Sequence, residues 1–218
     1  MSGQSGKGCV HSAHHFRTAL MLLSIIYLVA ITAEAMTGAL AAGRRQMDLF
    51  GVIIIACVTA LGGGTIRDVV LGHYPLAWVE NPEFLAYTVS AALLTILLAP
   101  IMHYLRKPFL VLDALGLVAF TLIGCAIALE MGHGPVITVI SGMMTGVFGG
   151  VLRDVLCNEV PMILRDRSPY ATCSFVGCWI YVGLTWLRAD QEVALLAGAL
   201  VTMGMRLVSV QFGWKLPS

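Results

Sequence analysis

Seven charged side chains lie within or at the ends of long apolar stretches of this sequence. They are Glu34, Arg67, Asp68, Asp113, Arg153, Asp154 and Arg206. A charge deep in an apolar medium costs several kcal/mol, so such side chains face other protein or a hydrated path and are candidate functional residues. The sequence has no nucleophile, phosphate-binding or Cys/His metal-ligand motif. We therefore expect no enzyme activity, no catalytic residue, no metal site and no cofactor.

Two glycine clusters precede two of these charged pairs. The first is Gly62, Gly63 and Gly64, and the second is Gly149 and Gly150. Each glycine disfavours a helix by about 1 kcal/mol relative to alanine, so we expect a bend or an unwound turn at each cluster. Two interpretations stay open: the glycines allow close helix packing, or freed carbonyl groups line a path for cations. Hydroxyl groups that would assist such a path belong to Thr59, Thr65 and Thr145.

The Arg–Asp neighbours follow each cluster at the same spacing. Adjacent residues on a helix point about 100° apart, so each arginine need not pair with its own aspartate. We expect either pairing between the two clusters, Arg67 with Asp154 and Arg153 with Asp68, or four side chains that snorkel to the membrane interface.

The three remaining charged residues have separate expectations. Glu34 lies well inside its apolar run and would attract a cation, relay a proton or neutralise an arginine. Asp113 lies four residues after the expected start of its helix, where the helix dipole explains a negative charge. Arg206 is expected to face other protein or a subunit interface, because its run is otherwise apolar.

The first part of the chain resembles the second part at an offset of 86 residues. Residues 63–70 match residues 149–156, and the match extends to Gly38 with Gly124 and Thr59 with Thr145. The repeated unit holds three apolar runs, so its second copy must enter a membrane from the opposite side. Inverted repeats are typical of transport proteins, although duplication is also a simple way to build a helical bundle.

Composition identifies the class of protein. Of the 218 residues, 58% are hydrophobic and 11% charged, and the mean hydropathy is +0.87, which excludes a water-soluble domain. The net charge of +1 excludes a nucleic-acid partner. Seven apolar runs long enough to cross a bilayer as helices fall at residues 18–42, 49–66, 84–105, 109–131, 135–152, 169–187 and 193–214.

We therefore predict an all-α polytopic membrane protein of seven transmembrane helices. Its parts are a polar tail (1–17), a three-helix repeat (18–105), an inverted second repeat (106–190) and a seventh helix with a short tail (191–218). Basic residues gather in alternate loops, so the positive-inside rule puts the C-terminus in the cytoplasm and the N-terminus outside. His11, His14 and His15 read as part of a solvated tail, and the six scattered cysteines as free buried thiols.

The doubled motif, Gly-Gly-Gly-Thr-Ile-Arg-Asp at residues 62–68 and Gly-Gly-Val-Leu-Arg-Asp at residues 149–154, resembles the prokaryotic branch of the trimeric intracellular cation (TRIC) channel family. Bacterial relatives of that branch also carry the label glycine transporter. The resemblance implies a homotrimer in a bacterial or archaeal inner membrane, with a potassium-permeable pore in each subunit and the second and fifth helices kinked at the glycines. Voltage and calcium control of animal members is not carried over, because their lysine- and glutamate-bearing motif is missing here.

Three functions remain open at this level. The first is passive conduction of K⁺ or Na⁺. The second is secondary transport of a small zwitterion such as glycine, with its ammonium group near Glu34 and its carboxylate at a half-helix N-terminus. The third is a membrane scaffold in which the glycines only pack.

Overall fold

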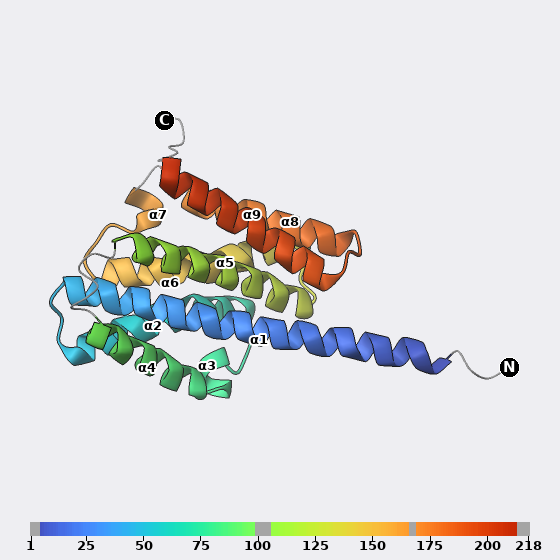
Figure 1. Ribbon diagram of the computed structural model, residues 1–218, viewed down its shortest axis with the longest axis horizontal. Helices are drawn as coiled ribbons and strands as arrows, with labels where there is room; N and C mark the ends of the chain where they lie inside the picture. The colour runs from blue at the N-terminus through green and yellow to red at the C-terminus, as the bar shows by residue number, and fades with distance from the viewer. Residues whose placement is uncertain (1–4, 99–105, 166–168, 213–218) are drawn as a thin grey trace.

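The computed structural model describes residues 5–98, 106–165 and 169–212. Within these residues the chain forms only helices, which run roughly along one direction (Figure 1). They are α1 (Ser5–Arg44), α2 (Leu49–Leu71), α3 (Ala77–Glu80), α4 (Glu83–Leu98), α5 (Arg106–Glu130), α6 (Pro135–Leu156), α7 (Met162–Arg165), α8 (Tyr170–Trp186) and α9 (Gln191–Phe212).

Local signals in the sequence explain where the central helices begin and end. Asp48 caps α2 by accepting a hydrogen bond from the backbone N–H of Gly51 at 2.8 Å. Gly72 ends α2 in the left-handed conformation, with φ at 69°, which glycine adopts without strain. α6 begins at Pro135, whose missing N–H is not needed in a first helical turn.

Five helices of the described residues are long and apolar enough to cross a membrane. They are α1 over Ile25–Arg44, α2, α5 over Phe109–Glu130, α6, and α9 over Gln191–Ser209. α4 is apolar but has 16 residues, and its expected span continues to residue 105, outside the described residues. α8 has 17 residues. The molecule is a polytopic helical membrane protein, as predicted from its composition.

Two features differ from the sequence prediction. The backbone is helical from Ser5, so the first helix takes in most of the expected polar tail; the side chains of His11, His14 and His15 lie outside the described residues. The short helices α3 and α7 were not predicted, because four residues are too few to produce a periodic pattern.

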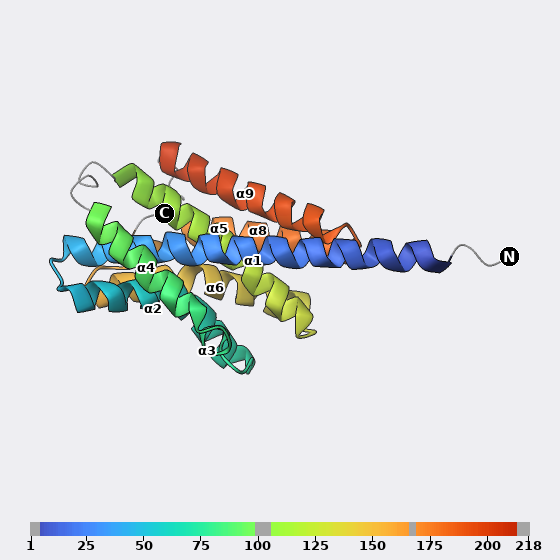
Figure 2. The same cartoon turned by 60° about the horizontal axis from the view of Figure 1, so that its bottom comes forward.

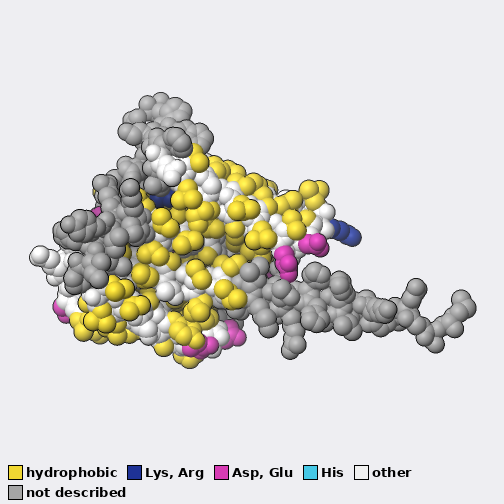
Figure 3. Space-filling view, in the orientation of Figure 1, with side chains coloured by type: hydrophobic (Ala, Val, Ile, Leu, Met, Phe, Trp, Pro, Cys, Tyr) yellow, Lys and Arg dark blue, Asp and Glu magenta, His cyan; other side chains and the backbone are white. Residues whose placement is uncertain are grey.

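The helices pack as two related groups around a central pair. α2 and α6 cross each other; α1 and α4 pack beside α2, and α5 and α8 pack beside α6. α9 packs on α8 and α5 (Figures 1 and 2). Apolar side chains cover much of the surface seen in Figure 3, and acidic and basic groups lie toward its ends, as expected for a lipid-facing bundle.

Candidate functional site

The α2–α6 crossing is built from two glycine–threonine contacts that repeat each other. A Cβ atom on Gly63 would collide with the backbone carbonyl oxygen of Thr145, and a Cβ atom on Gly149 would collide with that of Thr59. Each contact becomes the other when 86 is added to or subtracted from the residue numbers. The two helices therefore run antiparallel through their closest approach, related by an approximate twofold axis.

The flanking helices α1 and α5 approach the same threonines. A Cβ on Gly38 would meet the Thr59 hydroxyl oxygen at 2.7 Å. On α5, Gly124 lies equally tightly against the Thr145 hydroxyl. Glycine thus brings four helix backbones together at the centre of the bundle.

Of the bend or unwound turn expected at each cluster, the unwound turn is wrong and the bend stays a prediction. α2 is continuous from Leu49 to Leu71 and α6 from Pro135 to Leu156, so both helices pass through their glycine clusters without interruption. A glycine in a helix costs about 1 kcal/mol, which the close contact of neighbouring helices offsets here. Not every glycine is needed for contact: Gly62 faces a leucine side chain, whereas Gly64 and Gly150 have only ordinary contacts of 3.7 and 3.5 Å.

The three threonine hydroxyls donate to carbonyl oxygens of their own helices. Thr59 donates to Ile55 at 2.6 Å, Thr65 to Leu61 at 2.7 Å, and Thr145 to Ser141 at 2.8 Å. Their oxygen atoms keep acceptor capacity. Thr65 uses it, since it accepts a hydrogen bond from the indole N–H of Trp78 at 3.2 Å.

Each Arg–Asp pair forms the same compact anchor. Arg67 Nε donates to Asp68 Oδ1 at 2.9 Å, and Arg153 Nε donates to Asp154 Oδ1, also at 2.9 Å. The other oxygen of each aspartate accepts from the first backbone N–H of the following short helix, at Ala77 of α3 (3.3 Å) and at residue 162 of α7 (2.8 Å). Each aspartate therefore fastens a short helix to the end of a central one.

Both expectations for these pairs are corrected. The arginines bind their own aspartates, not those of the other repeat, because positions four residues beyond each glycine lie on opposite sides of an antiparallel crossing. They do not snorkel either: Arg67 and Arg153 are each 1% exposed.

The Arg67 site, on one side of the crossing, has few charges. Asp68 Oδ1 also lies 3.1 Å from His73 Nδ1. Tyr27 of α1 lies near enough to interact electrostatically with both Arg67 and Asp68. Arg67 Nη1 is buried without a hydrogen-bond partner.

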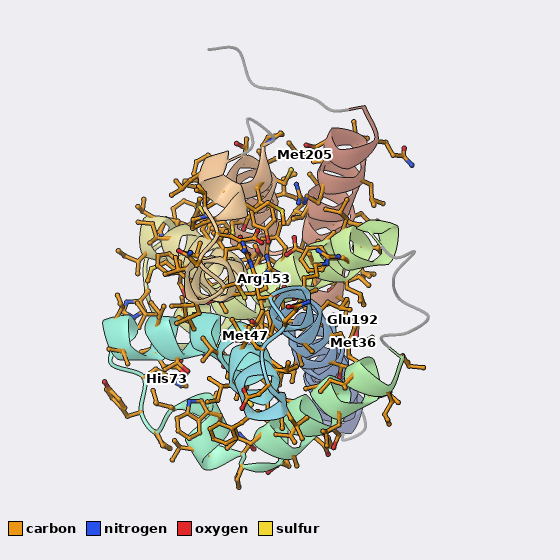
Figure 4. The ribbon with its side chains drawn as sticks, turned by 90° about the vertical axis from the view of Figure 1, so that its left-hand side faces the viewer. Met36, Met47, His73, Arg153, Glu192 and Met205 are labelled. Carbon is orange, nitrogen blue, oxygen red and sulfur yellow. The ribbon has the colours of Figure 1, made fainter. Side chains whose placement is uncertain are left out.

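The Arg153 site, on the other side, gathers charged groups from four helices. Figure 4 shows Arg153 in the interior of the bundle. Arg153 Nη1 donates to Asp113 Oδ1 on α5 at 3.0 Å and to the Thr37 hydroxyl on α1 at 3.1 Å. Its guanidinium lies 5.0 Å from the ring centre of Phe109. Arg206 of α9 comes within 3.7 Å of Asp113 Oδ2.

The structure shows what surrounds Glu34 and Arg206. Glu34 is 2% exposed, lies against Gly116, and its Oε2 accepts from the Thr37 hydroxyl at 3.1 Å. It therefore joins the Arg153 site through Thr37. Arg206 faces other protein as predicted, specifically Asp113 and the Tyr170 ring, 4.4 Å from its guanidinium carbon.

The expectation for Asp113 is wrong. α5 begins at Arg106, so Asp113 is two turns inside the helix, beyond the first turn where the dipole acts. It is fully buried and stabilised by Arg153.

Sequence reasoning missed Thr37, Tyr170 and Tyr27 as site residues. Neutral side chains inside apolar runs carry no charge signal. The repeat offset was the available signal for one of them, because Tyr27 occupies in the first repeat the position of Asp113 in the second.

Fold and site together define a helical membrane protein built from two antiparallel repeats, with a buried polar site on each side of their crossing. The model of the Glycine transporter family matches residues 24–100 and again residues 110–186, which confirms the duplication and its 86-residue offset. The chain belongs to this family, the prokaryotic branch of the TRIC channels that the doubled motif indicated.

Relatives and solved structures agree with this membership. The inner membrane protein YadS of Escherichia coli is 40% identical over 91% of this chain and 96% of its own length. A membrane protein of Vibrio cholerae is 37% identical over 96% of the chain and 87% of its own length. The TRIC trimeric intracellular cation channel orthologue from Rhodobacter sphaeroides matches with a TM-score of 0.85 and 38% identity, covering 88% of this chain and 99% of that one. A TRIC structure described for cation conductance matches at 0.83 and 35%, over 89% and 96%. The two solved structures are described as TRIC cation channels, and this family is not one of enzymes.

Proposed function

We propose that this protein is a monovalent-cation channel, permeable to potassium, which assembles as a homotrimer with a pore within each subunit. The observation that carries the proposal is the match over 88% of the chain to a trimeric cation channel, at a TM-score of 0.85 and 38% identity. The proposal takes K⁺ or Na⁺ as the permeant ion and includes no resident cofactor.

The conduction path of this proposal follows α2 and α6 past both buried polar sites. Buried charges are costly and are retained in membrane helices chiefly where they serve ion pathways, and the two sites lie on either side of the glycine crossing. Because the helices touch there through the backbone, we assign the crossing as the constriction of a closed pore. Separation of the helices at Gly63 and Gly149 would open it, exposing the oxygen atoms of Thr59 and Thr145 to an ion.

The proposal includes an inner-membrane location, with the N-terminus outside and the C-terminus in the cytoplasm. The relative YadS is named an inner membrane protein, and the alternation of basic loops supports the orientation. In this orientation the Arg153 site lies on the cytoplasmic side of the crossing and the Arg67 site on the outer side.

Planar-bilayer recording of the purified protein tests the channel. We expect unitary currents that reverse at the potassium equilibrium potential in asymmetric KCl, and a trimer mass in detergent. Counterflow of labelled glycine into proteoliposomes, without unitary currents, would instead establish the zwitterion carrier. If the protein shows neither activity, the scaffold function is favoured.

Recording the variant Gly63→Ala beside Gly64→Ala tests the constriction. The first adds a methyl group against a carbonyl oxygen, whereas the second adds it in ordinary contact. We expect Gly63→Ala to change the open probability at least tenfold relative to Gly64→Ala among molecules that assemble. Equal open probabilities of the two variants would show that the crossing is not the constriction of the pore.

A further inference from the structure

Two cysteines from different helices meet over one glycine, away from the polar sites. Cys125 of α5 and Cys178 of α8 are both fully buried, and both sulfur atoms lie closer than 3.0 Å to the position that a Cβ on Gly142 of α6 would occupy. Cys125 Sγ also approaches the Thr138 carbonyl oxygen at 3.5 Å.

The first repeat shows what this place looks like without sulfur. Subtracting 86 gives Ala39, Ala56 and Ala92, which are likewise buried. Three alanines therefore fill the equivalent three-helix contact. The second repeat has two thiols at this place and no methyl group between them, so the missing side chain of Gly142 leaves room for the sulfur pair.

We propose that Cys125 and Cys178 form a two-coordinate binding site for a soft divalent metal ion, of which mercuric ion is the representative. Thiolate sulfur selects soft ions. Binding forms two metal–sulfur bonds and breaks two S–H bonds, releasing two protons to solvent; no electron is transferred and no oxidant is needed.

The net charge of the metal–thiolate complex determines which soft ion the site favours. The pair is surrounded by apolar side chains, including Leu122, Val139 and Val182, where a net charge is expensive. A divalent ion with two thiolates is uncharged, whereas a monovalent soft ion would leave one negative charge. Zinc would require four ligands, and no group of three or more His, Cys, Asp or Glu ligands occurs among the described residues.

Metal binding is tested in a chain whose other four cysteines, Cys9, Cys57, Cys157 and Cys173, are replaced by alanine. The purified protein is incubated with HgCl₂, passed through a desalting column with a competing monothiol, and assayed for mercury per chain and for the ultraviolet mercury–thiolate absorption band. We expect one mercuric ion per chain. The matched control adds Cys125→Ala and Cys178→Ala, the residues of the first repeat, and should bind none.

Single replacements distinguish a shared ion from two separate adducts. Because two thiols held together act as a chelate, Cys125→Ala or Cys178→Ala alone should weaken retention by about 10²-fold or more. Retention by either single variant equal to that of the pair would overturn the proposal, as would two ions per pair. If the cysteine-depleted chain does not fold, the wild-type chain and its Cys125→Ala/Cys178→Ala variant are compared, with a difference of one ion expected and no difference refuting the site. The readout is bound metal, so it is independent of whether the protein conducts ions.

Discussion

The two buried polar sites share an anchor and differ in everything around it. At each, an arginine bonds its neighbouring aspartate, which fastens a short helix. Around Arg67 the first repeat then supplies Tyr27, and one guanidinium nitrogen stays without a partner. Around Arg153 the position of Tyr27 is taken by Asp113, and α1 and α9 add Thr37, Glu34 and Arg206.

This difference separates the features that both repeats share from those that only one side of the protein has. Features present in both repeats, namely the glycine crossing and the Arg–Asp anchor, hold the two halves together and, in the proposed channel, form the constriction and the polar site on each side of it. The charges concentrated on one side are additions that duplication alone does not supply. They also break the twofold relation between the two ends, so we infer that the two sides of the protein act differently on a passing ion.

The largest expected effect comes from removing a charge that the Arg153 site has and the Arg67 site lacks. Asp113→Asn leaves Arg153 and Arg206 buried with one carboxylate fewer between them, and breaking a buried ion pair costs about 3–5 kcal/mol. Tyr27→Phe, at the same position of the first repeat, should cost far less, because the Tyr27 hydroxyl has no charged partner at hydrogen-bond distance among the contacts described. Thermal unfolding midpoints in detergent compare the two; similar shifts would show that the two sites do not differ energetically.

The next effect tests the part that the repeats share. Gly63→Ala and Gly149→Ala each place a methyl group against a backbone carbonyl, so each should destabilise by about 1–3 kcal/mol, and by similar amounts. Gly64→Ala and Gly150→Ala are the controls and should be neutral or slightly stabilising, since alanine favours a helix. A loss confined to one of the two crossing variants would contradict the twofold symmetry of the crossing.

The same division between shared and added features describes what could be predicted from the sequence. Hydropathy and the 86-residue offset predicted the helical class, the duplication and the family, because these depend on patterns along the chain. The continuity of the helices through the glycine clusters was not predictable. The intrinsic helix propensity of glycine favours a break, and the close contact that offsets it comes from the facing helix, at Thr145 or Thr59. Cross-repeat pairing failed for a geometric reason: because Gly63 faces Thr145 and Gly149 faces Thr59, roughly ten to twelve residues of antiparallel helix put Arg67 and Arg153 about 15–18 Å apart along the axes.

A smaller effect is expected at Thr37, whose hydroxyl links two charged groups. Its oxygen accepts from Arg153 Nη1, and its proton faces both the Glu34 backbone carbonyl oxygen at 2.9 Å and Glu34 Oε2 at 3.1 Å. Thr37→Val should therefore cost about 1–3 kcal/mol by leaving a buried guanidinium N–H without its bond. Thr32→Val on the same helix is the control, because its hydroxyl donates to the Leu28 carbonyl and, among the described residues, contacts no charged group. Equal unfolding midpoints for the two variants would show that Thr37 does not bind the charge network.

The smallest effect is expected where the two sites differ at the surface. His73 and Glu159 occupy equivalent positions, and each donates its backbone N–H to the carbonyl of its anchor aspartate, Asp68 or Asp154, at 2.8 Å. Their side chains diverge: His73 turns to Asp68, whereas Glu159 pairs with Arg45 at 2.7 Å, joining the loop after α1 to the loop after α6.

Both members of the Arg45–Glu159 pair are about two-fifths exposed, so water and salt screen their attraction and the pair should contribute at most about 1 kcal/mol. A double-mutant cycle with Arg45→Ala and Glu159→Ala measures the coupling, and it should fall toward zero as salt is raised from about 0.1 to 1 M. A coupling above about 2 kcal/mol that persists in high salt would mean that this contact, and not only the buried charges, distinguishes the Arg153 site from its counterpart.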